Sequence, residues 1–244
     1  MKTFIRLALI VLCTAPALAF AQEIKKDLRF FSEVIVSPKI NLILERGERE
    51  SIRIVYAQVD PEKINIEQEG DRLKLYLDDA RLVDKREYRD DAYDSKVSIY
   101  RDAEITAYVT YTELELLEVR GAQEVTCRTP IQANDFVLRV YGETEIMLDT
   151  LNTERFKLVA YGENKIRIRG KAERQRYTLY GENKVDGRGL AGATITTNIY
   201  GEGRLQVNAS DEVKINAFGE PRIDVEGTSM INKGLILGKS EIRH

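Results

Sequence analysis

The sequence is poor in the residues that support disulfide bonding and imidazole chemistry. It has only two cysteines, Cys13 and Cys127, and the first lies in a segment that export would remove. A single remaining thiol excludes a disulfide framework, so the core must hold the fold together. The only histidine is His244, the last residue. The net charge of −3 argues against nucleic acid as a partner, because that role calls for a basic surface.

Long apolar runs are absent after the first 21 residues, and residues 1–21 read as a secretory signal peptide. Lys2 and Arg6 precede an apolar stretch that begins at Leu7, and Ala19-Phe20-Ala21 supplies an A-x-A cleavage site. This stretch is shorter than the roughly 20 residues needed to span a bilayer. We therefore expect an exported chain that begins at Gln22, lies in the periplasm, on the outer surface or in the medium, and does not span the membrane.

An aromatic-Gly-Glu tripeptide recurs five times, first in "VYGETEIML" from residue 140 and last in "AFGEPRIDV" from residue 217. Alignment on this glycine extends the series to seven members at intervals of 18 to 21 residues: Gly121, Gly142, Gly162, Gly181, Gly201, Gly219 and Gly238. A repeat of this length is typical of a solenoid.

Apolar residues take fixed positions around each glycine, and these positions are two residues apart. The fourth residue after the glycine is always aliphatic: Val125, Ile146, Ile166, Val185, Leu205, Ile223 and Ile242. A period of two is that of a strand, and so short a repeat leaves no room for a crossover helix. The sequence predicts an all-β fold, a parallel β-helix (solenoid) with coils of about 20 residues. Cys127 falls in an inward column and should be a core residue.

Residues 22–118 lack the strict repeat but keep the alternation of apolar and polar residues. Turn signals stand at Pro38, Gly47 and Gly70. We expect irregular N-terminal coils of the same β-helix here, followed by regular repeats over residues 119–244. Residues 78–96 are densely charged with both signs and lack the ligand spacing of a calcium loop. We interpret them as a solvated excursion.

The order of these segments resembles the GIN domain family, the head domains of auto-transporter adhesins. The likeness runs from about Phe30 to Ile242 and rests on "FFSEVIVSPKINLILERGERESIRIVY", "INIEQEGDRLKLYL" and "VTYTELELLEVRGAQEV", followed by the glycine-cornered coils. It implies a right-handed β-helix, secreted or associated with the cell envelope, with an adhesive role. Family members commonly have small residues beside the corner glycine, so the aromatic and glutamate residues here are particular to this chain.

Two columns of side chains beside the corner glycines form the candidate ligand-binding site. The aromatic column precedes the glycines: Tyr141, Tyr161, Tyr180, Tyr200 and Phe218. The glutamate column follows them: Glu143, Glu163, Glu182, Glu202 and Glu220. Both should point outward. Carboxylates one coil apart, about 4.8 Å, repel one another by about 0.9 kcal/mol per pair in water.

Three interpretations of these columns remain open. In the first they are structural, and a basic column of Lys165, Lys184, Arg204 and Arg222 neutralises the glutamates. In the second, aromatic faces stack on sugar rings and carboxylates accept their hydroxyls, as in an adhesin or polysaccharide-binding module. In the third, a cation bridges adjacent glutamates, which the neighbouring basic residues disfavour. We predict neither a cofactor nor a metal site.

Two further classes of function are considered. A polysaccharide lyase or hydrolase is disfavoured, because Asp186 and Asp224 share an outward column but stand two coils apart and no carboxyl group has an environment that suggests a raised pKa. We therefore expect no enzyme. The alternative to adhesion is an envelope scaffold. The last repeat, "LILGKSEIRH", lacks a polar cap, so the open coil should pair with a second copy in a homodimer.

Overall fold

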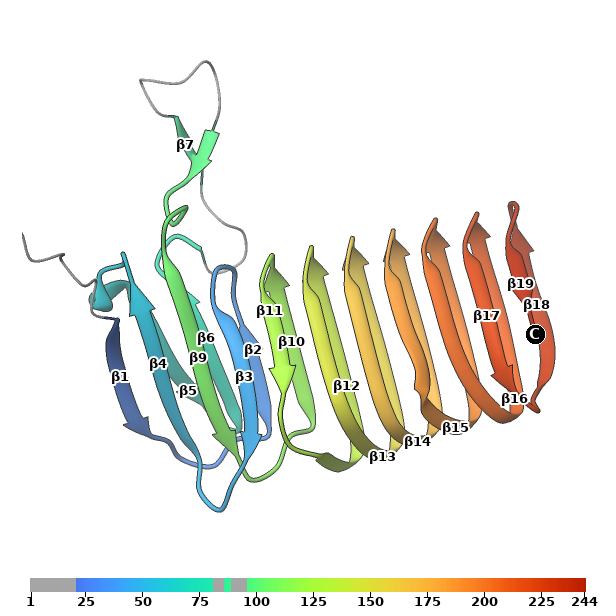
Figure 1. Cartoon of the computed structure of the whole chain (residues 1–244), viewed down its shortest axis with the longest axis horizontal. Coiled ribbons are helices and arrows are strands. Elements are labelled where there is room, and N and C mark those ends of the chain that lie inside the picture. Colours follow the sequence, from blue (N-terminus) through green and yellow to red (C-terminus); the bar gives the residue numbers. More distant parts are fainter. Residues whose placement is uncertain (1–20, 81–85, 89–95) are drawn as a thin grey trace, which may run out of the picture.

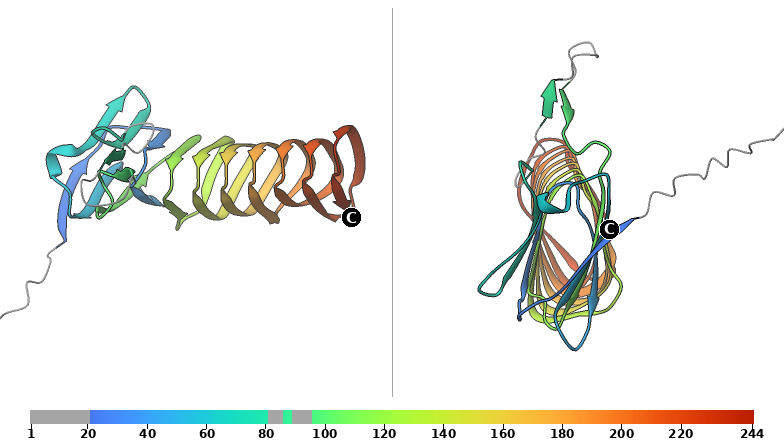
Figure 2. Two further views of the ribbon diagram at one scale, coloured as in Figure 1. Left: turned by 90° about the horizontal axis from the view of Figure 1, so that it is seen from above. Right: turned by 90° about the vertical axis from the view of Figure 1, so that its left-hand side faces the viewer.

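The structure is a computed structural model that describes residues 21–80, 86–88 and 96–244. It shows an elongated β-solenoid (Figure 1) whose cross-section is a flattened tube (Figure 2). Strands make up 73% of the chain, and the described ranges contain no α-helix. The predicted signal peptide lies outside the described residues except for Ala21, as do residues 81–85 and 89–95 of the charged excursion.

Long strands wrap around the solenoid and pair in parallel with their copies one coil away. Coils repeat about every 20 residues over about six turns. Corner glycines pair with one another, as Gly142 does with Gly162 and Gly162 with Gly181. The wrapping strands are β12 (Ile131–Gly142), β13 (Glu145–Gly162), β14 (Lys165–Gly181), β15 (Lys184–Gly201) and β16 (Arg204–Gly219). The predicted parallel β-helix is confirmed.

Each coil has two flat faces, which meet at the glycine corner along one edge and at a bend along the other. We call them the pre-corner face and the post-corner face, after their position relative to the glycine. The pre-corner face also includes β10 (Leu116–Gly121) and β18 (Met230–Leu237), and the post-corner face includes β11 (Glu124–Cys127), β17 (Arg222–Gly227) and β19 (Glu241–Arg243). Register shifts occur at the bend, between Leu148 and Leu151 and between Arg167 and Gly170. The bend therefore absorbs most of the variation in repeat length, and one further shift, between Ile215 and Ala217, lies on the pre-corner face.

The predicted inward columns fill the interior. Ile146, Ile166 and Val185 are each at most 2% exposed. A large buried side chain packs against a glycine. Tyr177 is fully buried, and a Cβ added to Gly187 would lie 3.0 Å from the hydroxyl oxygen of Tyr177. The absence of a side chain at Gly187 thus makes room for the ring.

Cys127 is a core residue, as predicted. Its side chain is buried, and its thiol donates a hydrogen bond to the carbonyl oxygen of Thr129 at 3.1 Å. Burial raises the pKa of the Cys127 thiol, which keeps the group protonated and unreactive near neutral pH.

The corner glycines are required by both torsion and space. All seven have φ between 95° and 134°, a region that residues with a side chain rarely adopt. The N–H of Glu182 donates to the carbonyl oxygen of Gly162 at 3.0 Å. Because that carbonyl lies directly beside Gly181, a Cβ on Gly181 would stand 2.6 Å from its oxygen. Glycine is the only residue type that tolerates both the positive φ and the close carbonyl oxygen.

The N-terminal region contains one coil and several antiparallel pairs. Strands β2 (Glu33–Val36) and β3 (Asn41–Arg46) stack in parallel on β10 and β11, and therefore form a coil. Beyond this coil, β6 and β9 continue the two faces in parallel, whereas β5 runs antiparallel to β6, β4 to β9 and β1 to β4. The bounds are β1 (Gln22–Asp27), β4 (Ser51–Ala57), β5 (Ile64–Glu69), β6 (Arg72–Leu77) and β9 (Glu104–Tyr111), with a 3-10 turn at Pro61–Lys63.

Within residues 22–118, where irregular coils are expected, β1, β4 and β5 pair antiparallel and so do not continue the parallel stack. Gly70, with φ of 58°, forms a tight turn between β5 and β6 and reverses the chain. A parallel neighbour would need a longer connection. Alternation of apolar and polar residues predicted the strands, but it carries no information on their direction.

The charged excursion leaves the fold between β6 and β9. Its described strands, β7 (Arg86–Tyr88) and β8 (Lys96–Ser98), pair antiparallel in a sheet of their own that projects from the N-terminal region (Figure 1). Where the excursion departs, Ala80 is buried and the Tyr100 hydroxyl donates to the carbonyl oxygen of Asp78 at 2.6 Å. The departure point is thus anchored to the core.

The corner geometry predicts a large cost for Gly181→Ala. The added methyl group would combine an unfavourable φ of 95° with an overlap against the Gly162 carbonyl, so the free energy of unfolding should fall by at least about 3 kcal/mol. Gly70→Ala is the matched control, since Gly70 has positive φ with open space around it and should cost about 1–2 kcal/mol. Urea unfolding would measure both; equal costs would contradict the steric account.

Candidate functional site

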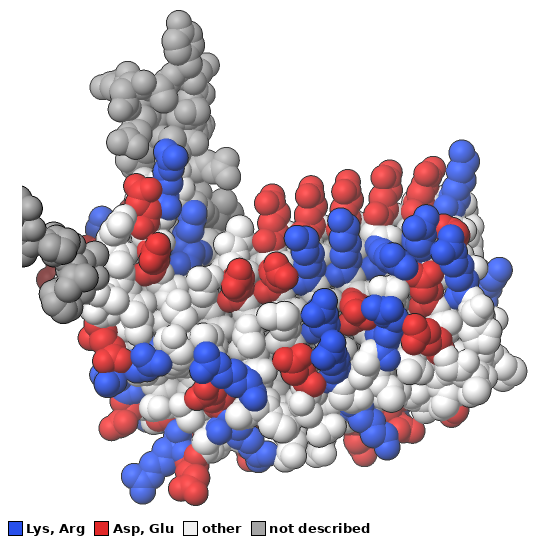
Figure 3. Space-filling model, viewed as in Figure 1, with Lys and Arg blue, Asp and Glu red and all other residues white. Residues whose placement is uncertain are grey.

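The aromatic and glutamate columns lie together along the glycine corner, and we call the two columns the corner ridge. In the space-filling view, acidic side chains project in a row from the upper edge of the coils, and basic side chains lie below them (Figure 3). All five glutamates are exposed, as are Tyr141, Tyr161 and Tyr200, at 36%, 42% and 37%. The structure therefore places every predicted site residue on one continuous surface.

The aromatic column is a continuous stack. Successive ring centroids are 5.4, 4.4, 4.8 and 4.7 Å apart, with interplanar angles of 6° to 9°. Burial raises the pKa of the Tyr180 phenol, and neighbouring Tyr161 adds to the effect. Because each interior ring face is turned towards the next ring, the column presents ring edges and phenol oxygens to solvent. Sugar stacking on exposed ring faces, the mode of binding in the second of the three interpretations, does not fit this geometry.

A buried amide network holds the corner from inside. The Oδ1 atom of Asn164 accepts from the Thr144 N–H at 3.0 Å and from its hydroxyl at 2.9 Å. The Asn164 amide nitrogen donates to the Tyr161 carbonyl at 3.0 Å and to Oδ1 of Asn183 at 2.7 Å. Asn183 in turn donates to the Tyr180 carbonyl at 2.9 Å. These amides fix the backbone that carries the aromatic column.

Sequence reasoning missed this network, although a signal was present. The string "YGENK" occurs twice, at residues 161–165 and 180–184, with asparagine two residues after the glycine. Alternation from the known inward positions would have placed that asparagine inside the corner. A buried amide needs partners, so the repeat of the same amide one coil away could have indicated mutual hydrogen bonding.

The glutamate column is not neutralised by ion pairs. Among the residues that the structure describes, no Lys or Arg nitrogen lies within 4.0 Å of these five carboxylates. Two members of the basic column pair elsewhere: Arg204 binds Asp224 at 2.6 Å and Arg222 binds Glu241 at 2.7 Å. The first interpretation requires the basic column to neutralise the glutamates, and no direct ion pair of the described residues does so. Within the described structure, the corner ridge thus keeps a row of like charges without ion-pair partners.

Within the described ranges, no group of three or more His, Cys, Asp or Glu side chains is placed to hold a metal ion. Asp186 and Asp224 align with Gln206 between them. Asp186 accepts hydrogen bonds from Arg188, which lower the pKa of its carboxyl group. A general acid needs the opposite shift.

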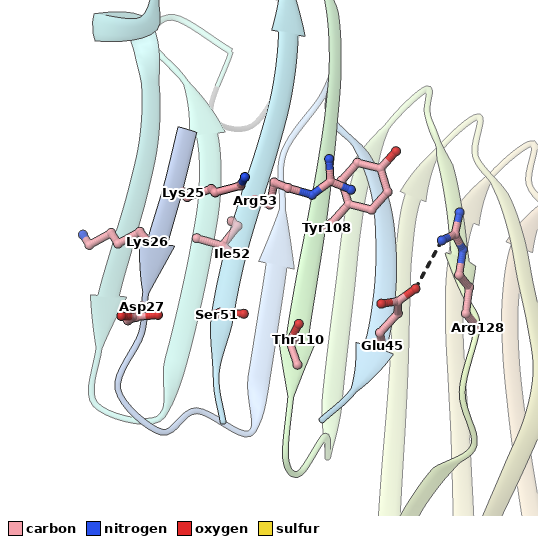
Figure 4. Close-up of a pocket in the computed structure, with 10 residues that line it drawn as sticks. All are labelled: Lys25, Lys26, Asp27, Glu45, Ser51, Ile52, Arg53, Tyr108, Thr110 and Arg128. Atoms are coloured by element: carbon pink, nitrogen blue, oxygen red, sulfur yellow. Dashed lines mark hydrogen bonds and ion pairs between the residues drawn. The ribbon is translucent and has the colours of Figure 1, made fainter. Parts of the chain in front are cut away.

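A separate depression of about 380 Å³ lies beside β1, β4 and β9 (Figure 4). In it the Arg53 guanidinium carbon lies 3.8 Å from the centroid of the Tyr108 ring, a cation–π contact. Its cations are largely paired: Glu23 binds Lys25 at 2.9 Å and Arg53 at 3.3 Å, and Glu45 binds Arg128 at 3.2 Å. This pairing makes the depression a weak candidate for binding an anion.

Comparison with known proteins identifies the family. Residues 30–229 match the family described as "Putative auto-transporter adhesin, head GIN domain". The chain belongs to this family. The likeness drawn from the order of its segments is thereby confirmed, and the GIN domain covers β2 to β17. No curated protein is significantly similar to the chain. No helix in the described ranges is long and apolar enough to cross a bilayer.

Several crystal structures share the GIN domain fold. A "putative adhesin" from Bacteroides fragilis has a TM-score of 0.74 at 14% identity, over 92% of this chain and 98% of that one. A "putative adhesin" from Parabacteroides merdae has a TM-score of 0.65 at 15% identity, over 91% and 95%. A protein from Parabacteroides distasonis with the same values is described as a "putative lipid binding protein". At these identities the likeness shows the fold alone.

The amide network predicts that Asn164→Ala destabilises the corner. The substitution leaves buried polar groups of Thr144 and Asn183 without partners, so the free energy of unfolding should fall by about 2–4 kcal/mol. Asn152→Ala removes an exposed asparagine from the neighbouring bend and should change it by less than about 0.5 kcal/mol. Chemical unfolding compares the two, and a similar small effect for both would show that the network is not needed.

Proposed function

We propose that this protein is a non-catalytic adhesive module, exported to the envelope or the cell surface, which binds a polysaccharide along the corner ridge. The description of its family and of two structural neighbours as adhesins supports the adhesive part. The signal-peptide pattern of residues 1–21 supports export. Pairing of Asp186 with Arg188 and of Asp224 with Arg204 supports the absence of catalysis.

One observation carries the proposal: the glutamate column is exposed, repetitive and without ion-pair partners in the described structure. Packing does not require these carboxylates, because their side chains face solvent. Like charges in a row oppose folding, and departures from local rules of this kind concentrate at functional sites. A carboxylate accepts hydrogen bonds from hydroxyl groups, and a fixed repeat suits a polymer with many of them.

The phenol groups extend this surface. Tyr141, Tyr161, Tyr180 and Tyr200 place one hydroxyl per coil beside one carboxylate, and Phe218 continues the stack without a hydroxyl. In the next coil Leu237 follows Phe218, and Lys239 takes the position after the corner glycine. The chemistry of the ridge therefore changes at that coil. In this proposal the ligand binds by hydrogen bonds at ring edges and not by stacking on ring faces.

The double variant Glu163→Gln, Glu182→Gln tests the proposal. Glutamine keeps the shape but removes two adjacent charges, so an uncharged polysaccharide from a glycan array should bind at least about tenfold more weakly. The melting temperature should stay equal or rise, because repulsion is relieved.

Glu48→Gln with Glu173→Gln is the matched control, since both glutamates are exposed and lie off the ridge. Its binding should equal that of the wild-type protein. Unchanged binding in the ridge variant, or no binding to any uncharged polysaccharide by the wild-type protein, would refute the proposed role of the ridge.

Self-association is the second candidate function, because the last coil exposes apolar side chains. Met230, Leu235 and Leu237 are 75%, 54% and 54% exposed. In the described structure β18 pairs only with β16, and β19 only with β17. An open strand edge with apolar side chains favours pairing with another chain, which would make the protein an envelope scaffold.

Light scattering would test this homodimer. The wild-type protein should have twice the mass of one chain at micromolar concentration, and the double variant Leu235→Lys, Leu237→Lys should have the mass of one chain, because charges at an edge oppose pairing. Circular dichroism should show the same strand content in both. A wild-type protein that is monomeric at high concentration would exclude self-association through this coil.

A further inference from the structure

Four basic side chains form a compact block on the pre-corner face, away from the corner ridge. Arg155 lies beside Arg174 in the strand register, and Lys157 lies beside Arg176. We call these four residues the basic block. Adjacent strands are about 4.8 Å apart, so the block brings four positive charges onto a small area of one sheet.

The basic block lines a hollow in this face. The hollow has a volume of about 360 Å³, and Thr194 and Thr196 also line it. These threonines continue the rows of the block, since Thr194 pairs in register with Arg174 and Thr196 with Arg176. Their hydroxyls can donate hydrogen bonds. The hollow therefore combines cations and neutral donors with one carboxylate, that of Asp135.

Two cations of the block are paired and two are not. Arg155 binds Asp135 through two nitrogens, and Glu154 lies 3.6 Å from Arg155 and 3.7 Å from Arg174. In contrast, no carboxylate oxygen of the described residues lies within 4.0 Å of Lys157 or Arg176. These two cations repel each other, and a bound anion would relieve the repulsion.

Other basic clusters of the described structure differ from the basic block in their acidic neighbours. In the depression near Tyr108, Arg53 and Arg128 have carboxylate partners. Lys165 and Lys184 stand two residues after ridge glutamates on the same outward side, and their surroundings also include Glu145 and Asp186. The basic block combines two cations that have no ion-pair partner among the described residues, a hollow and hydroxyl donors.

We infer that the basic block binds sulfate or phosphate ester groups of an anionic polysaccharide. Such an ester presents several oxygens in a tetrahedral arrangement. An arginine can bind two of them at once, and a lysine or a threonine hydroxyl can bind another. This ligand chemistry is the opposite of that of the corner ridge, which presents carboxylates.

The arrangement fits a linear polymer better than an isolated ion. The column that contains Lys157 and Arg176 continues through Thr196 to Lys214, so its cations follow the solenoid axis. Lys157 stands four residues before Tyr161, about 13 Å along an extended strand. The basic block is thus a site separate from the corner ridge, and the inference does not depend on the proposed function of that ridge.

Dextran sulfate and uncharged dextran of the same length would test the inference by surface plasmon resonance on the purified protein. Wild-type protein should bind dextran sulfate, and the affinity should fall as salt screens exposed charges. The double variant Lys157→Gln, Arg176→Gln should bind it at least about tenfold more weakly. Lys165→Gln with Lys184→Gln removes the same charge and should stay within about twofold of wild type.

If the variant Lys157→Gln, Arg176→Gln and the control Lys165→Gln, Lys184→Gln lost the same affinity for dextran sulfate, the inference would be overturned. Binding would then respond to net charge alone. Binding of anionic phospholipid vesicles without binding of dextran sulfate would also overturn the inference, because it would identify a membrane surface as the ligand. The ridge variant Glu163→Gln, Glu182→Gln should bind dextran sulfate no more weakly than wild type. Failure of the ridge proposal and failure of this inference therefore give different results.

Discussion

The hydrogen bond between a backbone N–H just after one corner glycine and the carbonyl of the corner glycine one coil earlier is the contact on which the rest of the structure depends. It carries strand pairing around the corner, as from Glu163 to Gly142 and from Glu182 to Gly162. It brings the carbonyl so close to the next glycine that a side chain cannot fit there. The residues on either side of the glycine are consequently held in straight columns.

Whether such a column stabilises the fold depends on its chemistry. Aromatic rings stack with nearly parallel planes, and the amides of Asn164 and Asn183 bond to one another, so both columns favour the stacked state. Carboxylates in the same position oppose it. One backbone constraint thus produces an aromatic stack, a buried amide network and an exposed row of carboxylates.

Much of this fold follows from periodicity. The two-residue alternation around the glycines predicted the inward columns and Cys127 among them, because inward and outward positions alternate strictly in a strand. It also predicted that Tyr161 and Tyr180 would neighbour one another. It could not predict that Arg204 forms its ion pair with Asp224 and not with a ridge glutamate. A long side chain can reach acidic groups both along its own strand and in neighbouring coils. Nor could periodicity predict the turn at Gly70 that makes β5 antiparallel to β6.

The two edges of the solenoid differ in how regular the coils are. At the glycine corner all seven glycines share a positive φ, whereas most register shifts lie at the opposite bend, between Leu148 and Leu151, between Arg167 and Gly170 and between Gly187 and Ala191. One shift, between Ile215 and Ala217, lies on the pre-corner face. An insertion at the bend would lengthen one coil without displacing Tyr161 from Tyr180. The bend is therefore the edge at which the fold can accept new loops while the surface along the corner keeps its spacing.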